Sequence, residues 1–198
     1  MIKRHTPAPL KGGIKVRIMT IAVVGIGLIG GSLMLDLRKR NFADRIIGVE
    51  NNPQHRNIAL LSGMIDEAET IENAVDMSDL IILCAPVDIN CAMLPRILDR
   101  ITGTSKVVTD MGSTKAAIAE ISKDHPARGR HVAAHPMAGT EYSGPLAAIG
   151  KLFDYKIAII CDPELSDPDA QELTENMLKT LNMRITYMNS SVHDIHVA

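Results

Sequence analysis

The stretch AVVGIGLIGGS, residues 22–32, decides how the rest of this sequence is interpreted, because apolar residues run directly into a cluster of glycines. Before the cluster, residues 17–25 have the apolar and β-branched character of a strand. After it, residues 28–41 carry apolar side chains at helical spacing, with Leu33 and Leu37 on one face. The glycines therefore lie between a predicted strand and a predicted helix.

Gly25, Gly27 and Gly30 form a GxGxxG pattern in this position, which is the structural context of a dinucleotide-binding loop. In such a loop the first glycine permits a tight turn, the second lets the backbone approach the pyrophosphate, and the third lets helix and strand pack closely. Free amides at the start of the helix, where Leu28 and Ile29 lie, would hold the anion. The alternative is a glycine-rich turn in an α/β domain that binds no nucleotide.

An acidic residue about 20 residues further on, at the end of the second strand, binds the adenosine ribose in sites of this type. Glu50 has this position at the end of the predicted strand 45–50. A carboxylate there would repel a 2′-phosphate, and Asn51 and Asn52 bring no positive charge, so the sequence favours NAD over NADP. The alternative is a solvated acid at the end of a strand.

The rest of the chain alternates short apolar segments with helical patterns, which is typical of βαβ units around a parallel sheet. Further strands are predicted over 80–86, 106–110, 131–134, 155–161 and 184–188. Helices are predicted over 53–62, after Asp88 as a cap with a break at Pro95, after Ser113 as a cap, and from Asp167 onward. We therefore expect an α/β fold of the Rossmann type, with a mostly parallel sheet and helices on both faces.

The composition is that of an ordinary globular protein, with 198 residues, 46% hydrophobic residues and a net charge of -2. Aromatic residues make up only 3%, and no basic excess is present, which argues against nucleic acid as a partner. No apolar run reaches the ~18 residues of a membrane span, so no membrane association is predicted. Three cysteines without a CxxC pair indicate a reduced, cytoplasmic location.

Three regions are expected along the chain. Residues 1–17 are basic and lack the apolar segment of a signal peptide, so they are interpreted as a mobile leader, with an alternative start site or organellar targeting left open. Residues 18–189 form the dinucleotide-binding domain. Residues 190–198 begin another helix and stop, which indicates the start of a truncated helical domain.

Groups that act on a substrate are expected after later strands, because open α/β sheets bind ligands at the carboxyl ends of their strands. Two loops qualify, 109–115 with Ser113 and 133–144 with His135. An imidazole with an unperturbed pKa of about 6.5 is a natural acceptor for the hydroxyl proton of an alcohol undergoing oxidation. Ser113 by itself is better explained as a helix cap. His131 and His135 lie on a strand, where i, i+4 spacing does not make a zinc face, so no metal site is predicted.

Four segments together carry a family resemblance: VVGIGLIGGSL, DMGSTK, HPMAGTEYSG and the HD pair near the end. In this order they resemble the prephenate/arogenate dehydrogenase family of tyrosine biosynthesis, from about residue 18 to the end. The resemblance implies NAD-dependent oxidative decarboxylation of prephenate to 4-hydroxyphenylpyruvate, or of arogenate to tyrosine. In that reaction the ring carbon bearing the hydroxyl group gives a hydride to nicotinamide, the ring carboxylate leaves as carbon dioxide, and the ring becomes aromatic.

The resemblance also implies roles for individual residues. His135 would hydrogen-bond the ring hydroxyl, and Ser113 would lie between this histidine, the substrate and the nicotinamide. Thr140 and Glu141 would line the same pocket, with His193 near its edge. These three residues have structural alternatives as well: satisfying loop backbone, a solvated acid, and packing between domains.

Ala85 and Pro86 would bound the cofactor groove, or would simply end a strand. Family members continue into an all-helical domain that makes the homodimer and supplies basic groups for the substrate's carboxylates. That domain is absent from this sequence, which leaves Lys115 and Lys151 as candidate cations. If the 198 residues were the whole molecule, we would expect cofactor binding without efficient turnover.

Two other functions stay open. One is a non-catalytic or truncated nucleotide-binding or regulatory module derived from such an enzyme, and the other is a different small-molecule reductase on the same fold. The presence of Ser113 and His135 favours an enzymatic ancestor, whereas the abrupt end favours the module.

Overall fold

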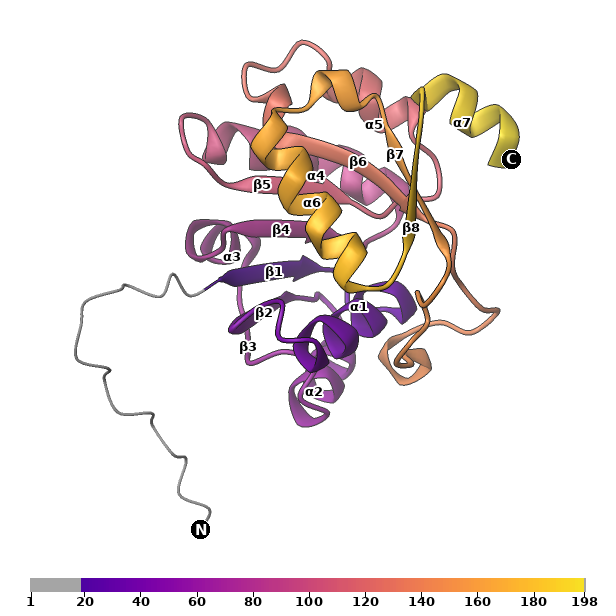
Figure 1. The fold of residues 1–198 in the computed structure, drawn as a ribbon. Helices are drawn as coiled ribbons and strands as arrows, with labels where there is room; N and C mark the ends of the chain where they lie inside the picture. The colour runs from indigo at the N-terminus through magenta and orange to yellow at the C-terminus, as the bar shows by residue number, and fades with distance from the viewer. Residues whose placement is uncertain (1–18, 198) are drawn as a thin grey trace, which may run out of the picture.

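The computed structural model describes residues 19–197, so the predicted leader over 1–17 lies outside the described residues. Eight strands form one sheet, in the order β3-β2-β1-β4-β5-β6-β7-β8 (Figure 1). The strands are β1 (Thr20–Val24), β2 (Arg45–Val49), β3 (Glu67–Ala68), β4 (Leu80–Leu83), β5 (Val107–Asp110), β6 (His131–Pro136), β7 (Ile157–Cys161) and β8 (Arg184–Met188). The α-helices are α1 (Leu28–Lys39), α2 (Pro53–Leu61), α3 (Ile71–Met77), α4 (Val87–Ile101), α5 (Ala116–Ser122), α6 (Pro168–Thr180) and α7 (Ser190–Val197). Short 3-10 turns are η1 (Arg128–Arg130), η2 (Pro145–Ala147) and η3 (Pro163–Leu165).

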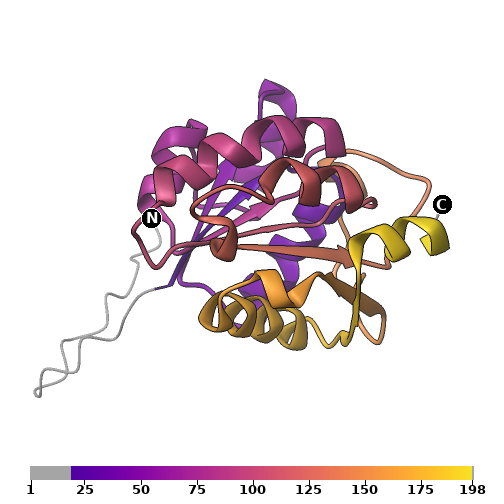
Figure 2. The same cartoon turned by 90° about the horizontal axis from the view of Figure 1, so that it is seen from above.

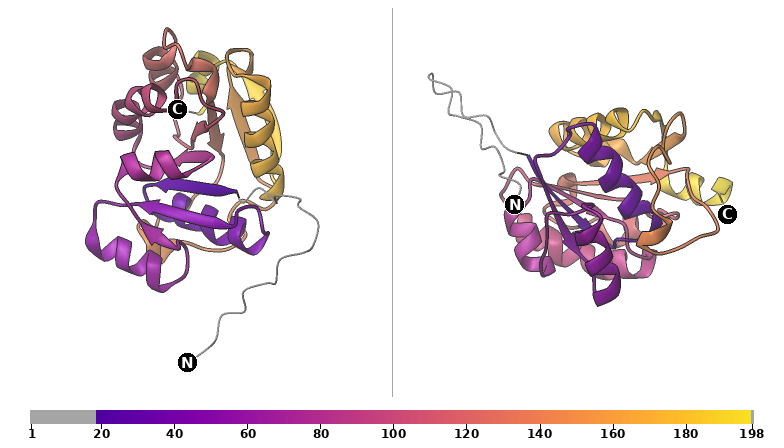
Figure 3. Two further views of the ribbon diagram at one scale, coloured as in Figure 1. Left: turned by 90° about the vertical axis from the view of Figure 1, so that its left-hand side faces the viewer. Right: turned by 90° about the horizontal axis from the view of Figure 1, so that it is seen from below.

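The sheet is parallel from β3 through β6, and β7 is the point at which its direction changes. β7 pairs antiparallel with β6, and β8 pairs parallel with β7. Helices cover both faces, as the views from above and from the side show (Figures 2 and 3). The prediction of a mostly parallel, Rossmann-type sheet is therefore confirmed.

Alternation along β1 divides the apolar residues between two cores, one on each face of the sheet. Ile21 and Val23 pack with buried residues of α1, α2 and α6. Ala22 and Val24 pack with buried residues of α3, α4 and α5. Because side chains on a strand point alternately to opposite faces, a strand covered on both sides is expected to be apolar on both, as β1 is after its first residue, Thr20.

Helix α4 differs from its prediction. Pro95 lies inside a continuous helix, and the N-cap residue is Pro86, so the predicted cap at Asp88 and the predicted break at Pro95 are wrong. An interior proline costs a helix ~3 kcal/mol. Four fully or almost fully buried side chains of α4 (Leu94, Ile97, Leu98 and Ile101) offset this cost, since each buried side chain of this size contributes roughly 1.5–3 kcal/mol.

Strand β3 and helix α3 were not predicted. They are only 2 and 7 residues long, which is too short for a repeating pattern of apolar residues. The other predicted strands and helices are present, including α7, which begins at Ser190. The division of the chain at residue 190 into two domains stays a prediction.

The topology determines where a ligand can bind. Chain order reverses around β1, which lies between β2 and β4, and the carboxyl ends of these three strands meet at one edge of the sheet. A crevice forms at such a reversal because the connections leave the sheet on opposite faces. No helix in the described part of the chain combines the length and the apolar character needed to cross a membrane.

Candidate functional site

The glycine turn between β1 and α1 leaves no space for a side chain at two of its positions. Gly25 has a φ of +88°, and a Cβ atom added to it would lie 2.7 Å from the backbone nitrogen of Ala85. A Cβ atom on Gly30 would lie 2.1 Å from the carbonyl oxygen of Gly25. The turn and the close packing of α1 therefore need glycine at both positions, whether or not a ligand binds.

Gly27 is different, because a Cβ atom added to it would have no neighbouring atom within 4 Å. It is the N-cap residue of α1, and no side chain caps this helix. In α2, by contrast, the side chain of Asn52 accepts hydrogen bonds from the backbone amides of Gln54 and His55. The first amides of a helix have no partner within it and favour negative charge. The uncapped start of α1, next to open space, therefore fits an anionic group.

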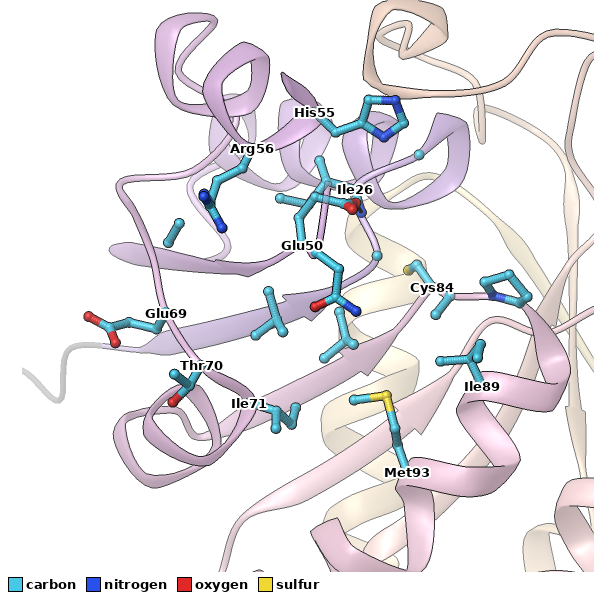
Figure 4. A pocket seen from close by; sticks show the side chains of 18 of the residues that line it. Ile26, Glu50, His55, Arg56, Glu69, Thr70, Ile71, Cys84, Ile89 and Met93 are labelled. Atoms are coloured by element: carbon cyan, nitrogen blue, oxygen red, sulfur yellow. Dashed lines mark hydrogen bonds between the residues drawn. The ribbon is translucent and has the colours of Figure 1, made fainter. Parts of the chain in front are cut away.

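A cleft of about 1360 Å³ opens at this turn, along the carboxyl ends of β1, β2 and β4 (Figure 4). Small-molecule sites usually measure roughly 300–1,000 Å³, so the cleft is large enough for a dinucleotide. The predicted cofactor-binding residues that line it are Gly25, Gly27, Glu50, Ala85 and Pro86. The other four do not line the cleft: Leu28, Ile29 and Gly30 lie in the first turn of α1, and Ser113 lies in the loop after β5.

Glu50 holds the glycine turn from the end of β2. Its Oε2 accepts a hydrogen bond from the backbone amide of Ile26 at 3.0 Å, and its Oε1 accepts one from the backbone amide of Asn52 at 2.9 Å. An ionised carboxylate offers about four acceptor positions, so two remain available to hydroxyl groups of a ligand in the cleft. This geometry fits the predicted contact with ribose hydroxyls.

The cleft also contains residues that the sequence interpretation missed. Figure 4 shows Arg56 on the α2 side and Ile89 and Met93 on the opposite, α4 side. Ile89 is 45% exposed. Ile89 and Met93 are four residues apart and so lie on one face of α4, and this spacing of two apolar residues was the sequence signal that could have identified them. No sequence signal marked Arg56, because its place in the cleft depends on how α2 packs.

A second group of polar residues lies at the carboxyl end of β6. His135 Nδ1 is 2.9 Å from Nε2 of His193, which comes from α7. His193 Nδ1 is in turn 2.7 Å from Oδ1 of Asp194. His193 is fully buried, whereas His135 is only partly buried. His193 therefore lies behind His135, although the resemblance placed it near the edge of the pocket.

The surroundings of His135 keep its imidazole neutral. Burial lowers the pKa of His135 from 6.5 to about 4. The electrostatic interactions with Lys115 and His193 act in the same direction, whereas those with Asp110 and Asp194 oppose it. At neutral pH this side chain is therefore free to accept a proton.

A buried charge cluster adjoins His135 in the sheet. Lys115 Nζ pairs with the carboxylate of Asp110 and donates a hydrogen bond to the carbonyl oxygen of Ala134 at 2.7 Å. The other oxygen of Asp110 is 3.0 Å from His131 Nε2. The side chain of Lys115 is 0% exposed, so the prediction that it faces the substrate's carboxylates is wrong. A buried ammonium needs a permanent partner, which Asp110 supplies.

Ser113 lies exposed in the loop between β5 and α5, and it does not cap the helix. Helix α5 begins at Ala116, with Lys115 as its N-cap residue. The carboxylate of Asp194 accepts hydrogen bonds from the amides of Lys115 and Ala116, at 2.7 and 2.8 Å. The capping alternative for Ser113 is therefore wrong, because a residue of α7 takes that role.

Thr140 and Glu141 lie exposed in the loop that follows β6. Thr140 Oγ1 accepts a hydrogen bond from the backbone amide of Tyr142 at 3.2 Å. Between residues 19 and 197, no hydrogen bond joins Ser113, Thr140 or Glu141 to the two histidines. Their roles at the substrate stay predictions, as does that of the exposed Lys151.

The fold agrees with comparisons with known proteins. Residues 33–187 match the family described as prephenate dehydrogenase, nucleotide-binding domain. The prephenate dehydrogenase of Bacillus subtilis is 33% identical over 177 residues, which are 88% of this chain and 48% of that protein. The cyclohexadienyl dehydrogenase of Zymomonas mobilis is 27% identical, over 88% of this chain and 59% of its own length. The chain thus spans about half the length of the curated relatives it matches.

Solved structures show the same similarity. The arogenate dehydrogenase of Synechocystis superposes with a TM-score of 0.80 and 31% identity, covering 90% of this chain and 63% of that chain. A prephenate dehydrogenase from A. aeolicus, in complex with hydroxyphenyl propionate and NAD+, gives a TM-score of 0.75 and 26% identity, covering 91% and 63%. Because the family match extends over most of the described residues, this chain belongs to the prephenate dehydrogenase family and carries its nucleotide-binding domain.

Proposed function

We propose that this chain is the NAD-binding part of a dehydrogenase that oxidises and decarboxylates prephenate or arogenate. The observation that carries the proposal is the position of two features at the same edge of the sheet. One is an open, uncapped helix start at Gly27, and the other is a neutral histidine, His135, at the end of β6. The relatives named above, among them an arogenate dehydrogenase and a prephenate dehydrogenase with NAD+ bound, support the choice of reaction.

The residues of the cleft fit the cofactor. The first amides of α1 would hold the pyrophosphate beside Gly27, and the two open acceptor positions of Glu50 would bind ribose hydroxyls. Ile89 and Met93 offer apolar contact to a base. When bound, NAD supplies the acceptor for the hydride.

The preference for NAD over NADP also follows from the charges of this cleft. Glu50 would repel a 2′-phosphate, and Glu67 and Glu69 lie along the same wall. Arg56 is the basic residue that could compensate on this side. We propose that the acids prevail, because Glu50 is held in place by two backbone amides, whereas Arg56 is on a long, flexible side chain.

His135 would accept the proton of the ring hydroxyl while a hydride leaves the ring carbon that bears this hydroxyl. Its neutral state at pH 7 is what a general base requires. Ser113, exposed in the loop after β5, would orient the same hydroxyl, and Thr140 and Glu141 would complete the pocket around the ring, with His193 behind His135. The substrate's carboxylate leaves as carbon dioxide without a nucleophile, so positioning and electrostatics are the chain's contribution to the rate.

The location and assembly of the protein stay predictions. The cytoplasmic location rests on the cysteine content, and the homodimer rests on the family resemblance. Because Lys115 is buried against Asp110, the groups that neutralise a dianionic substrate are expected outside the described cluster, with Lys151 the remaining candidate named from sequence.

Turnover and binding test the proposal separately. We expect NADH to form from NAD with prephenate or arogenate, measured by its near-ultraviolet absorbance, and we expect NAD alone to raise the melting temperature. Replacing the proton acceptor in H135N should lower kcat by about 10²- to 10⁴-fold and leave NAD affinity unchanged. The matched control is H196N, which changes an exposed histidine of α7.

Unchanged turnover in H135N would refute the assignment of the base. Stabilisation by NAD without turnover of either substrate would favour the alternative of a nucleotide-binding module. The absence of any stabilisation by NAD would refute both.

A further inference from the structure

The histidine pair at the end of β6 is linked to a third residue, Asp194, which acts only as a hydrogen-bond acceptor. We propose that Asp194, acting through His193, fixes His135 in the tautomer that carries its proton on Nδ1, so that Nε2 is the atom that accepts the substrate's proton. Asp194 and His193 are thus positioning residues. The tautomer follows from the hydrogen-bond geometry together with the ionised state of Asp194, and its use in catalysis rests on the proposed function.

The first step concerns the carboxylate of Asp194. Its Oδ1 accepts the backbone amide of Lys115 at 2.7 Å, and its Oδ2 accepts the backbone amide of Ala116 at 2.8 Å. Burial by itself raises the pKa of Asp194, but hydrogen bonds from Ala116, His193 and Lys115 outweigh it, and the pKa is lowered. Asp194 is therefore ionised and can only accept hydrogen bonds.

The second step concerns the ring of His193. Its Nδ1 is 2.7 Å from Oδ1 of Asp194, so Nδ1 must carry a proton. In the neutral imidazole the other nitrogen, Nε2, then has a free lone pair. Because His193 is fully buried, its ring has no access to water that could supply another partner.

The third step reaches His135. Its Nδ1 is 2.9 Å from Nε2 of His193, and the two rings meet edge to face at an angle of 68°. A lone pair on His193 requires a donor opposite it, so Nδ1 of His135 carries the proton. The remaining nitrogen of His135, Nε2, is then the acceptor.

The proton balance of the reaction agrees with this arrangement. As the O–H bond of the substrate breaks, its proton forms a bond to Nε2 of His135, and the imidazole becomes an imidazolium. The proton on Nδ1 can then move toward Nε2 of His193, whose other nitrogen faces the carboxylate of Asp194. The three side chains together carry one negative charge before the step and none after it, so Asp194 stabilises the charge that develops.

The same carboxylate also fixes the loop that holds Ser113. By accepting the amides of Lys115 and Ala116, Asp194 ties the start of α5 to α7. The two proposed catalytic side chains, His135 and Ser113, therefore depend on one residue for their relative position. Loss of this residue should affect kcat more than the KM for NAD, which binds in the separate cleft.

The test measures the tautomer directly and needs no activity. In ¹⁵N-labelled protein at neutral pH, multiple-bond ¹H–¹⁵N spectra should show His135 with a protonated Nδ1 and an unprotonated Nε2. The variants D194N and H193N should shift His135 toward a mixture of tautomers. H193N keeps the carboxylate that holds α5, so it separates loss of the tautomer from loss of the helix start, and H196N is the control on the same helix.

In the active protein, H193N and D194N should lower kcat by about 10²- to 10⁴-fold, the range seen between loss of a general base and a wrong tautomer in Ser-His-Asp triads. The KM for NAD should stay within about twofold, as expected for a group outside the cofactor site. A wild-type spectrum with the proton of His135 on Nε2, or no change of tautomer in either variant, would overturn the inference. The expected spectra together with an absence of turnover would instead refute the proposed function.

Discussion

Alanine at Gly27 should weaken cofactor binding and alanine at Gly30 should lower stability, although the two residues are only three positions apart. A methyl group at Gly27 meets no atom of the protein within 4 Å, and it would occupy the space next to the uncapped start of α1. A methyl group at Gly30 would lie 2.1 Å from the carbonyl oxygen of Gly25. The first change therefore acts on the ligand, and the second acts on the fold.

The magnitudes follow from these distances. At Gly27, the lower entropy of the unfolded chain stabilises by roughly 0.4–1 kcal/mol, and a poorer N-cap offsets it by a similar amount, so the melting temperature should hardly change. At Gly30, the gain in helix propensity is about 1 kcal/mol, but the overlap requires a backbone shift that costs up to about 3 kcal/mol. A net loss of ~2 kcal/mol lowers the melting temperature by about 4–8 °C in a domain of this size.

Cofactor affinity gives the complementary result. A methyl group at Gly27 should prevent at least one charge-assisted hydrogen bond of roughly 1.5–3 kcal/mol between the helix start and a pyrophosphate, which raises the Kd of NAD by about tenfold or more. Scanning calorimetry without ligand and titration calorimetry with NAD measure the two quantities. The control is G103A, whose position has a φ of +75° beyond the end of α4, and which should lower stability without affecting NAD.

Wild-type affinity for NAD in G27A would refute the assignment of the cofactor site. An unchanged melting temperature in G30A would refute the packing argument.

Three further predictions concern buried and bound charges. K115M leaves Asp110 buried without its cation and should lower the free energy of unfolding by about 3–5 kcal/mol in urea denaturation; a loss below about 0.5 kcal/mol, typical of surface changes, would contradict it. Because the pKa of His135 is lowered to about 4, kcat/KM should decrease on the acid side near that pH. The free energy of unfolding should also decrease as the pH falls from about 6.5 toward 4, because in this range the unfolded state takes up a proton on this histidine and the folded state does not. A histidine NMR titration measures the same pKa, and a value near 6.5 would contradict the burial argument. E50A should weaken NAD more than NADP in titration calorimetry, and the opposite ranking would remove the cofactor preference.

The sequence was sufficient wherever a local pattern has one physical cause. Apart from β3 and α3, the order of strands and helices followed from apolar periodicity, and the glycine turn followed from its place between β1 and α1. It was insufficient where a contact joins distant segments. Asp194 caps α5 across 78 residues, and nothing near Ser113 indicates that its capping role is taken by α7.

The same limit explains the wrong interpretation of Lys115. A lysine after a glycine and two polar residues looks solvent-exposed in sequence, and only the packing of α5 against the sheet buries it. Likewise Pro95 marks a helix end by its own chemistry, and the burial of its neighbours in α4 is what overrides that tendency.

The buried pair of Lys115 and Asp110 is better explained by position than by stability. Replacing a buried ion pair with apolar side chains is often neutral or stabilising, so the pair is a poor means of holding a fold together. Here, however, each partner holds backbone near the histidines: Lys115 Nζ binds the carbonyl oxygen of Ala134, one residue before His135, and Asp110 binds the amide of Gly112 in the loop after β5. One pair therefore fixes the loop of the proposed serine and the strand of the proposed base, and the ammonium also lowers the pKa of His135. Two apolar side chains could fill the same volume, but they could supply neither of these hydrogen bonds nor the positive charge.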